Sequence, residues 1–401
     1  LLFPTLIGIT IVIFSVMATA PGGLEPDRFG EDVDPETRAR LQAAIRARYG
    51  LDQPVPVQYL VWLNRVSPIG FSSDPETQAY TSFGFKAPDL GDSKVFKRPV
   101  GDLILEKLPI TILLNLLAIP LIYIVAITIG VYAAKNRGKA FDVGSGFVTL
   151  GLWSIPVMWT GVLLVVFVTG KNYLGWFPTP DRTLISADMV NASFLPTFGS
   201  KDDVAIFLGF PLLGIALGGW LGHRFLKIPG AMLFGLIGLI VAISIVEFAD
   251  LMSPVFSRGF LLDRMWRLVL PVVCLVYTGF AYLSKLTRAA VLENILADYA
   301  RTARAKGLRE NAILWGHVFR NSLLPLITVA ASLLPAMMAG ALIVERVFQI
   351  DGMGSMMVDA AMGKDRDLVL SVALISGVLT LIGYLLADLC YAAADPRVSY
   401  D

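Results

Sequence analysis

A basic stretch in the second half of the chain has the clearest chemical character. It reads ADYARTARAKGLRENAILWGHVFRN over residues 297–321, and Gly307 divides it into two amphipathic parts. Residues 285–320 carry seven basic and three acidic side chains, a net charge of +4. In a soluble protein this pattern would suggest a nucleic-acid site. Here it lies between two long apolar segments in a chain whose net charge is only +1, so we expect no nucleic-acid partner.

Motifs of phosphate, metal and nucleophile chemistry are missing from the sequence. The stretch AAKNRGKA (133–140) departs from a P-loop because alanines replace the first glycine and the final Ser or Thr. There is no HExxH and no GxSxG motif. The two histidines, His223 and His317, are far apart in sequence, and neither lies near a cluster of cysteines or carboxylates. We therefore expect no catalytic residue, no metal site and no cofactor bound by this chain.

The composition is that of a membrane protein. Hydrophobic residues make up 55% of the chain and charged residues 16%, with a mean hydropathy of +0.67, whereas soluble domains are about 25% charged. A membrane-spanning helix needs about 20 mainly apolar residues. Eight segments meet this requirement: 1–20, 109–134, 144–169, 204–222, 230–249, 268–286, 323–344 and 368–391. Cys274 and Cys390 both lie in apolar runs, so no disulfide framework is predicted.

The charges of the connections predict the orientation of these spans. One side would hold KNRGK (135–139), HRFLK (223–227), residues 287–320 and the tail PRV (396–398), and short loops rich in Lys and Arg stay in the cytoplasm. Segment 21–107, with 13 acidic and 11 basic side chains, would lie on the other side. Both termini are therefore predicted to be cytoplasmic. Segment 1–20 is interpreted as a span, not a signal peptide, and because the sequence starts inside this run we expect a short piece before it.

The polar segment 21–107 contains its own helix signal. Asp34 is a typical N-cap, Pro35 suits the first helical position, and the pattern ends at Gly50. The run LDQPVPVQYLVWLNRV (51–66) follows and could pack beside that helix. The segment is too long for a simple loop and too short for a large domain.

Few polar side chains lie within the predicted spans: Asn115, Glu247 and Asp388. A proton-relay transporter usually needs more ionisable groups than this. An ion-coupled secondary transporter would also show inverted repeats with broken helices, and a membrane-embedded enzyme would need a polar constellation at one depth. The sequence shows neither clearly. For Asp388 we prefer a structural role near Arg397 or a basic loop, while Asn115 either bridges helices or lines a path.

The basic stretch is predicted to form a surface helix that ends at a glycine turn. Apolar residues from Leu286 to Ala300 fall near one face of a helix over 285–306. Gly307 stops it as a C-terminal glycine does, and the next span begins near Leu323. Such a helix can lie on anionic lipid or dock in a groove of another protein. A solvated loop that obeys the positive-inside rule would share the composition, but it does not explain the glycine break.

These residues resemble the cytoplasmic coupling loop of ABC-importer permeases of the dipeptide, oligopeptide and nickel class. DYARTARAKGL (298–308) and LWGHVFRNSLLPLIT (314–328) are similar to that loop, whose glycine corresponds to Gly307 and whose downstream Leu-Pro corresponds to Leu324–Pro325. In the wider superfamily the loop opens with Glu-Ala-Ala. The Arg-Thr-Ala found here at 301–303 is the form common in the peptide branch.

Further similarities run the length of the chain in the family's order. They are PTLIGITIVIF (4–14) with APGG (20–23), YGLDQPVPVQY (49–59), EKLPITILLN (106–115), GWFPT (175–179), ERVFQIDGMGSMMVDAAMGKD (345–365) and LADLCYAAADPRVSY (386–400). The LDQP segment resembles the first-permease subunit of such importers, as opposed to its shorter partner.

The resemblance implies an all-α integral membrane protein of the bacterial inner membrane. Such a permease pairs with a second homologous permease, with two ABC ATPases that hold ATP and magnesium, and with a periplasmic solute-binding protein. It moves peptides or similar small solutes by alternating access, and the sequence does not reveal which solute. The residues expected to couple to the ATPases, through charge contacts or packing, are Asp298, Tyr299, Arg301, Thr302, Ala303, Arg304, Lys306, Gly307 and Leu308.

The chain departs from the family in its number of spans, because the branch has six and this sequence predicts eight. The additional pair forms an inserted hairpin, whose first helix has Gly214, Gly218 and Gly222 four residues apart, a face suited to close helix packing. The predicted organisation is a first span (1–20), a periplasmic segment (21–107), spans two and three with an outer loop (108–203), the hairpin (204–250) and the permease core (251–401).

Overall fold

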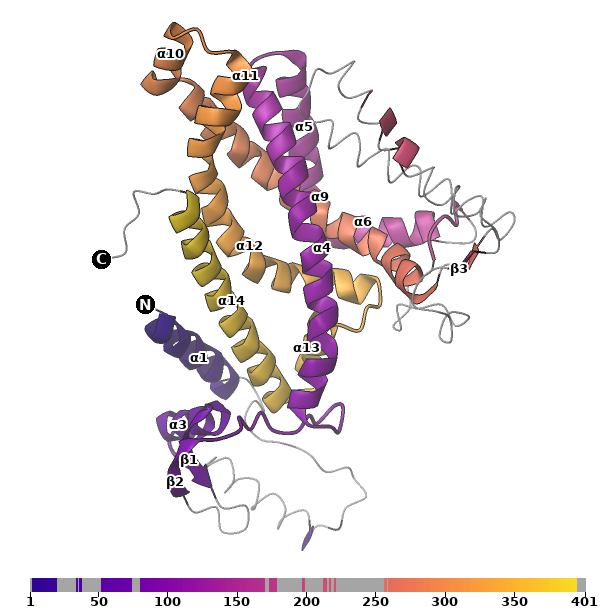
Figure 1. Cartoon of the computed structure of the whole chain (residues 1–401). Helices are drawn as coiled ribbons and strands as arrows, with labels where there is room; N and C mark the ends of the chain where they lie inside the picture. The colour runs from indigo at the N-terminus through magenta and orange to yellow at the C-terminus, as the bar shows by residue number, and fades with distance from the viewer. Residues whose placement is uncertain are drawn as a thin grey trace. The chain divides into compact units, whose positions relative to one another are not determined.

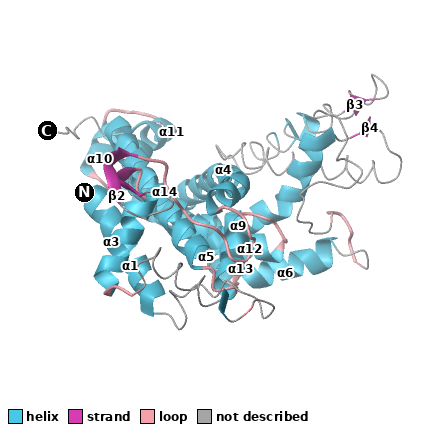
Figure 2. Ribbon diagram, turned by 90° about the horizontal axis from the view of Figure 1, so that it is seen from below, coloured by secondary structure: helices cyan, strands magenta, loops and turns pink. Residues whose placement is uncertain are grey.

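The computed structural model describes residues 2–19, 34, 36–37, 52–73, 80–169, 173–178, 197–198, 212–214, 216–217, 220, 256–257 and 259–394. Over these residues the chain is mainly helical, and the strands form only short pairs (Figures 1 and 2). The chain divides into two compact units. One comprises Leu1–Thr111 with Gly352–Ile382, and the other comprises Ile112–Asp351 with Gly383–Asp401.

Long apolar helices confirm the expected helical membrane architecture. Four described helices are long and apolar enough to cross a membrane: Val100–Lys135, Asp263–Ile295, Glu310–Ala330 and Arg366–Ala392. They belong to α4 (Val100–Lys135), α9 (Gly259–Ile295), the segment that leads into α12 (Phe319–Val347), and α14 (Arg366–Ala394). The predicted spans 109–134, 268–286, 323–344 and 368–391 fall within these helices. The first predicted span forms α1 (Leu2–Thr19).

Residues 144–169, predicted as one span, do not form one straight helix. They divide into α5 (Ala140–Ser154), α6 (Val157–Leu164) and a π-helical turn, η1 (Val165–Thr169), with a bend of 88° between the two parts. The break has a local cause. Pro156 has no N–H to donate, and its ring disfavours helical geometry at Ile155, which is extended at φ −84° and ψ 121°.

The unit that holds the first helix also contains most of the described polar segment. Here α3 (Val55–Val66) follows Pro54 and packs against α1 through Phe14, Trp62 and Val66, together with Leu370 of α14. A second cluster joins the first turns of α4, including Leu103, to α13 (Met353–Met362) and to the start of α14. The helix over 34–50, beside which the LDQP run was expected to pack, lies mostly outside the described residues, and in the structure the run packs on the first span.

Charged side chains fasten the polar segment to the start of α14. Arg65 of α3 donates to Asp367 at 3.2 Å. Asp365, just before α14, accepts hydrogen bonds from the Ser93 hydroxyl at 2.6 Å and from the Val95 N–H at 3.0 Å. Segments far apart in the sequence therefore form one unit.

Two small antiparallel pairs complete the described secondary structure: β1 (Ile69–Ser73) with β2 (Tyr80–Phe85), and β3 (Thr197–Phe198) with β4 (Phe256–Ser257). The predicted N-cap at Asp34 is present, since its carboxylate accepts a hydrogen bond from the Thr37 N–H at 3.3 Å. The rest of that helix, most of the inserted hairpin, and Glu247, His223 and Arg397 lie outside the described residues.

In the second unit α4 and α9 approach closely at two glycines. A Cβ on Gly130 would lie 2.6 Å from the Thr287 Cβ and 2.7 Å from the Ser284 carbonyl oxygen. A Cβ on Gly279 of α9 would lie 2.6 Å from Cδ1 of Ile122 in α4. At Gly130 the helix meets the backbone of α9, and at Gly279 the α9 backbone meets the Ile122 side chain, so both contacts favour a small residue.

Candidate functional site

The basic stretch contains a short separate helix, α10 (Asp298–Ala305). The sequence predicted one helix over 285–306, and this was wrong in one respect: α9 ends at Ile295 and α10 begins after Ala297, whose backbone is extended at ψ 152°. The break turns the small side chains of α10 onto an apolar cluster. Tertiary packing of this kind commonly overrides local helix propensity.

The turn at Gly307 confirms the predicted end of the helix. Gly307 has φ +79°, the left-handed region that glycine adopts without a Cβ penalty. The Leu308 N–H donates to the Ala303 carbonyl at 3.3 Å, and the Gly307 N–H donates to that of Arg304 at 2.9 Å. These two bonds form a Schellman motif. Because a Cβ at Gly307 would meet no atom within 4 Å, the backbone conformation, and not lack of space, requires glycine there.

One face of α10 packs against other helices of the same chain. Ala300 is fully buried and Ala303 nearly so, in a cluster of small and branched apolar side chains. The other members are Val131 and Ala134 of α4, Val291 of α9, and Ile313, Leu314 and Val318 of the segment before α12. That segment comprises α11 (Glu310–Ile313) and a π-helical turn, η3 (Leu314–Val318). The helix is thus fixed to three long helices at one end of the unit (Figure 1).

Polar bonds hold both ends of α10. Arg304 donates to Glu310 at 2.8 Å and to the Ile295 carbonyl at 3.3 Å, so it ties α10 to α11 and to the end of α9. The Tyr299 hydroxyl donates to Asn294 at 2.6 Å. Arg304 and Tyr299 were predicted to face a partner, and in the structure both make bonds within the loop.

The opposite face of α10 is exposed. It presents Asp298, Arg301, Thr302 and Lys306, and Leu308 follows the turn with 44% of its surface exposed. The pair between Arg301 and Asp298, at 3.5 Å, is open to solvent, and such pairs contribute little to stability. This face is therefore available for contact outside the chain.

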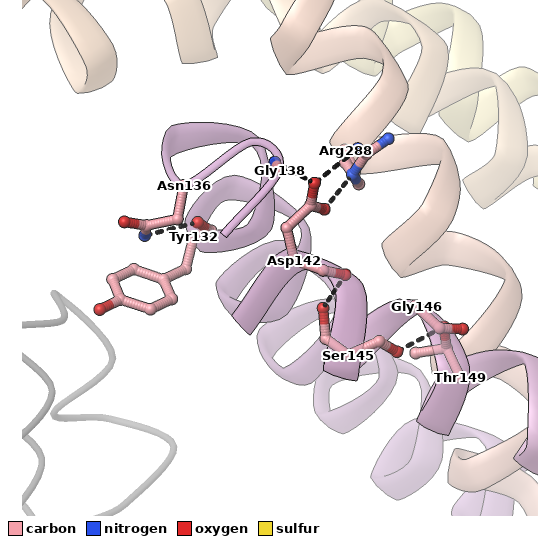
Figure 3. A network of polar contacts seen from close by, with 8 residues as sticks. All are labelled: Tyr132, Asn136, Gly138, Asp142, Ser145, Gly146, Thr149 and Arg288. Carbon is pink, nitrogen blue, oxygen red and sulfur yellow. Dashed lines mark hydrogen bonds and ion pairs between the residues drawn. The ribbon is translucent and has the colours of Figure 1, made fainter. Parts of the chain in front are cut away.

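An ion pair below the loop fixes α5 to α9. Arg288 donates through Nε and Nη2 to the two carboxylate oxygens of Asp142, at 2.5 and 2.8 Å, and the Gly138 N–H donates to the same carboxylate at 2.9 Å (Figure 3). Nearby, Lys135 at the end of α4 donates to Asn311 of α11 at 2.9 Å. The connection between α4 and α5 is thus joined to α9, which precedes α10, and to α11, which follows it.

Asp142 is buried, with 6% of its surface exposed. The sequence analysis missed Asp142. The available signal was an acidic residue next to the basic KNRGK connection at the entry to an apolar segment, but no local pattern points to Arg288 as its partner.

The other polar residues singled out from the sequence do not gather into a site. Asn115 is buried in α4, His317 is exposed in η3, and Asp388 is exposed on α14. Both cysteines are free thiols, Cys274 buried and Cys390 exposed. Among the residues that the structure describes, no three histidines, cysteines or carboxylates are close enough to hold a metal ion.

Comparison with known proteins defines the family. Residues 214–400 match the "Binding-protein-dependent transport system inner membrane component" family, and residues 2–115 match the N-terminal component of the same systems. The oligopeptide transport system permease protein AppB of Bacillus subtilis (strain 168) is 30% identical over 398 residues, 99% of this chain and 96% of that protein. The chain belongs to this family of transport permeases.

Other similar permeases extend over the whole chain. The dipeptide transport system permease protein DppB of Escherichia coli (strain K12) is 28% identical over 401 residues, 100% of this permease and 96% of that protein. A putative peptide transport system permease protein of Brucella suis biovar 1 (strain 1330) is 30% identical over 398 residues. The chain is thus a multi-pass permease of the inner membrane and not an enzyme, as its apolar helices also indicate.

Proposed function

We propose that this permease is one transmembrane subunit of an ATP-driven importer and that α10 is the helix through which ATPase subunits move it. The observation that carries this proposal is the two-sided character of α10. Ala300 and Ala303 fix one face to the ends of α4, α9 and α12, while the opposite face is polar and exposed. A short helix fastened to several long helices can transmit a push without bending.

The coupling contact would use the exposed residues. Arg301, Lys306 and Asp298 offer charges, Leu308 and part of Tyr299 offer apolar surface, and Thr302 lies between them. Three other residues would fix the position of the helix instead. Arg304 would do so through its bond to Glu310, Ala303 through the buried face, and Gly307 through the turn. This division of labour refines the set of residues expected from the sequence.

The partners would be a second homologous permease, two ABC ATPases and a periplasmic solute-binding protein. ATP and magnesium would be bound by the ATPases and not by this chain. The basic connections around α10 would lie in the cytoplasm with both termini. The polar segment 21–107, which contains α3 and the β1–β2 pair, would lie outside, where the solute-binding protein docks.

We further propose that the transported solute is a peptide. Relatives that cover nearly the whole chain are permeases of oligopeptide and dipeptide systems. Membership of the binding-protein-dependent family favours this reading over the ion-coupled secondary transporter, which would need no ATPase.

The test is co-purification followed by reconstitution. The tagged chain is extracted from its native membrane in mild detergent and the co-purifying proteins are identified by mass spectrometry. We expect a second permease and one or two P-loop ATPases, and we expect ATP-dependent uptake of labelled peptide into liposomes when a binding protein is present. Recovery of the chain alone, with uptake that does not require ATP, would contradict the proposal.

A further inference from the structure

The two ends of α5 are both held by α9. At its first turn Asp142 is bound by Arg288, as described above. At its other end the Tyr277 hydroxyl of α9 donates to the Ile155 carbonyl at 3.0 Å. Tyr277 and Arg288 are 11 residues apart, about 16 Å along a helix at 1.5 Å per residue, and Asp142 and Ile155 are 13 residues apart, about 20 Å. Helix α5 therefore lies antiparallel along α9 and is fastened at both ends.

Tyr277 also bonds to the far side of the break between α5 and α6. Its hydroxyl accepts a hydrogen bond from the Thr160 hydroxyl at 3.0 Å, while it donates to Ile155. One hydroxyl thus bridges the last residue before Pro156 and the first turn of α6. Tyr277 is 7% exposed, so the bridge is shielded from solvent. In a membrane-embedded bundle a carbonyl at a helix break must find a donor within the protein, and Tyr277 supplies it.

Helix α9 is also the helix that leads into α10. Only Leu296 and Ala297 separate the two, and the Arg304 bond to the Ile295 carbonyl spans that gap. A displacement of α10 would therefore be passed to α9, as well as to α4 and the segment before α12. From α9 the displacement would reach α5 through the Arg288–Asp142 pair. It would reach the break between α5 and α6 through the Tyr277 hydroxyl.

We propose that Tyr277 and Arg288 are positioning residues for transport: they clamp α5 and the start of α6 onto α9, so that movement of α10 changes the bent α5–α6 segment. This inference rests on the proposed function of α10. The clamp consists of Tyr277, Arg288, Asp142 and Thr160. When the Tyr277 hydroxyl is absent, ATP hydrolysis continues, but less of each α10 displacement reaches α6.

The test measures coupling in the complete complex, reconstituted in liposomes with its ATPases and binding protein. Binding-protein-stimulated ATP hydrolysis and uptake of labelled peptide are recorded together for Tyr277→Phe. We expect uptake per ATP hydrolysed to fall about two- to tenfold, the range for loss of one or two buried hydrogen bonds, while the hydrolysis rate stays within about twofold.

A matched control and a milder variant complete the design. Tyr123→Phe removes a hydroxyl that donates to the Leu326 carbonyl at 2.9 Å, outside the clamp, and should leave uptake per ATP unchanged. Thr160→Val keeps the bond between Tyr277 and Ile155, so it should lower the ratio by a smaller factor than Tyr277→Phe does.

The outcomes separate the clamp from the function on which it rests. If the unmodified complex shows no ATP-dependent uptake, both the proposed function and the clamp are refuted. If the unmodified complex transports peptide but Tyr277→Phe has the same uptake per ATP, the clamp alone is refuted. An equal loss of uptake and hydrolysis would also refute it, because that result indicates a defect of assembly and not of coupling.

Discussion

Arg288 donates hydrogen bonds to both carboxylate oxygens of Asp142, at 2.5 and 2.8 Å, although the two residues are 146 positions apart in the sequence. The two partners differ in exposure: the Asp142 side chain is 5% exposed and that of Arg288 is 37% exposed. A carboxylate left buried without its cation is far more costly than a cation that can turn toward water.

This difference predicts unequal effects of the two truncations. Arg288→Ala should destabilise the permease by about 3 kcal/mol because it strands a buried charge. Asp142→Ala should cost only about 1 kcal/mol, because Arg288 can be hydrated. The measurement is the shift of the thermal unfolding midpoint of the purified complex. Equal shifts for the two variants would show that the pair is more open than its geometry indicates.

The turn after α10 predicts which residues can replace Gly307. Gly307→Val should leave the protein in the membrane and abolish uptake, because a β-branched residue resists φ +79°. Gly307→Asn is the matched control, since asparagine tolerates the left-handed region and a Cβ meets no neighbour within 4 Å. It should retain most of the uptake. Normal uptake by Gly307→Val would refute the role of this turn.

The two close approaches of α4 and α9 predict different responses to one added methyl group. In Gly130→Ala the new Cβ meets the Ser284 backbone and Cβ of Thr287, which cannot move aside, so we expect a loss of about 1–3 kcal/mol. In Gly279→Ala it meets only side-chain atoms of Ile122, the nearest being the terminal Cδ1, so the loss should be smaller, about 1 kcal/mol. Unfolding midpoints of the two variants provide the comparison, and the reverse order would contradict the packing described here.

The buried face of α10 predicts that substitutions of two alanines on this helix differ in their effect on stability. Ala300 is fully buried and Ala305 is exposed. Ala300→Leu should displace α10 from its cluster at a cost of about 1–3 kcal/mol, whereas Ala305→Leu should not change stability measurably. Limited proteolysis of the detergent-solubilised chain reports the effect, as faster cleavage near residue 297 in the first variant only. Equal protection in both would mean that α10 is not held by this face.

The proposed orientation predicts where single thiols react. In a chain with both native cysteines replaced by alanine, Leu60→Cys on α3, 61% exposed, should react with a membrane-impermeant maleimide in intact cells stripped of their outer membrane. Lys306→Cys, exposed beside the Gly307 turn, should react only after the membrane is opened. A protected thiol at position 60 with a reactive one at position 306 would invert the topology.

Local chemistry explains what could be predicted from the sequence. The long apolar helices follow from composition, because about 20 apolar residues suffice to make a span. The end of α10 follows from one glycine, whose left-handed backbone needs no distant contact. The family follows from the resemblance of DYARTARAKGL (298–308), LWGHVFRNSLLPLIT (314–328) and further segments along the chain to its permeases, which needs no tertiary contact. Pro156 is also a sequence signal for the bend, but the continuous apolar character of 144–169 led to the prediction of a single span.

Tertiary structure alone decided how these parts are joined. No pattern in the sequence pairs Asp142 with Arg288, or brings the Tyr277 hydroxyl to the Ile155 carbonyl, because these contacts depend on α5 lying antiparallel along α9. The separation of α9 from α10 likewise depends on an apolar cluster drawn from three regions of the chain. The sequence by itself determined the long apolar helices α4, α9, α12 and α14, the basic charge of the stretch 297–321 and the glycine turn, since each is set by neighbouring residues. Only the packed structure decided which side chains fasten the helices together, because hydrogen bonds between distant residues exist only once the helices have met.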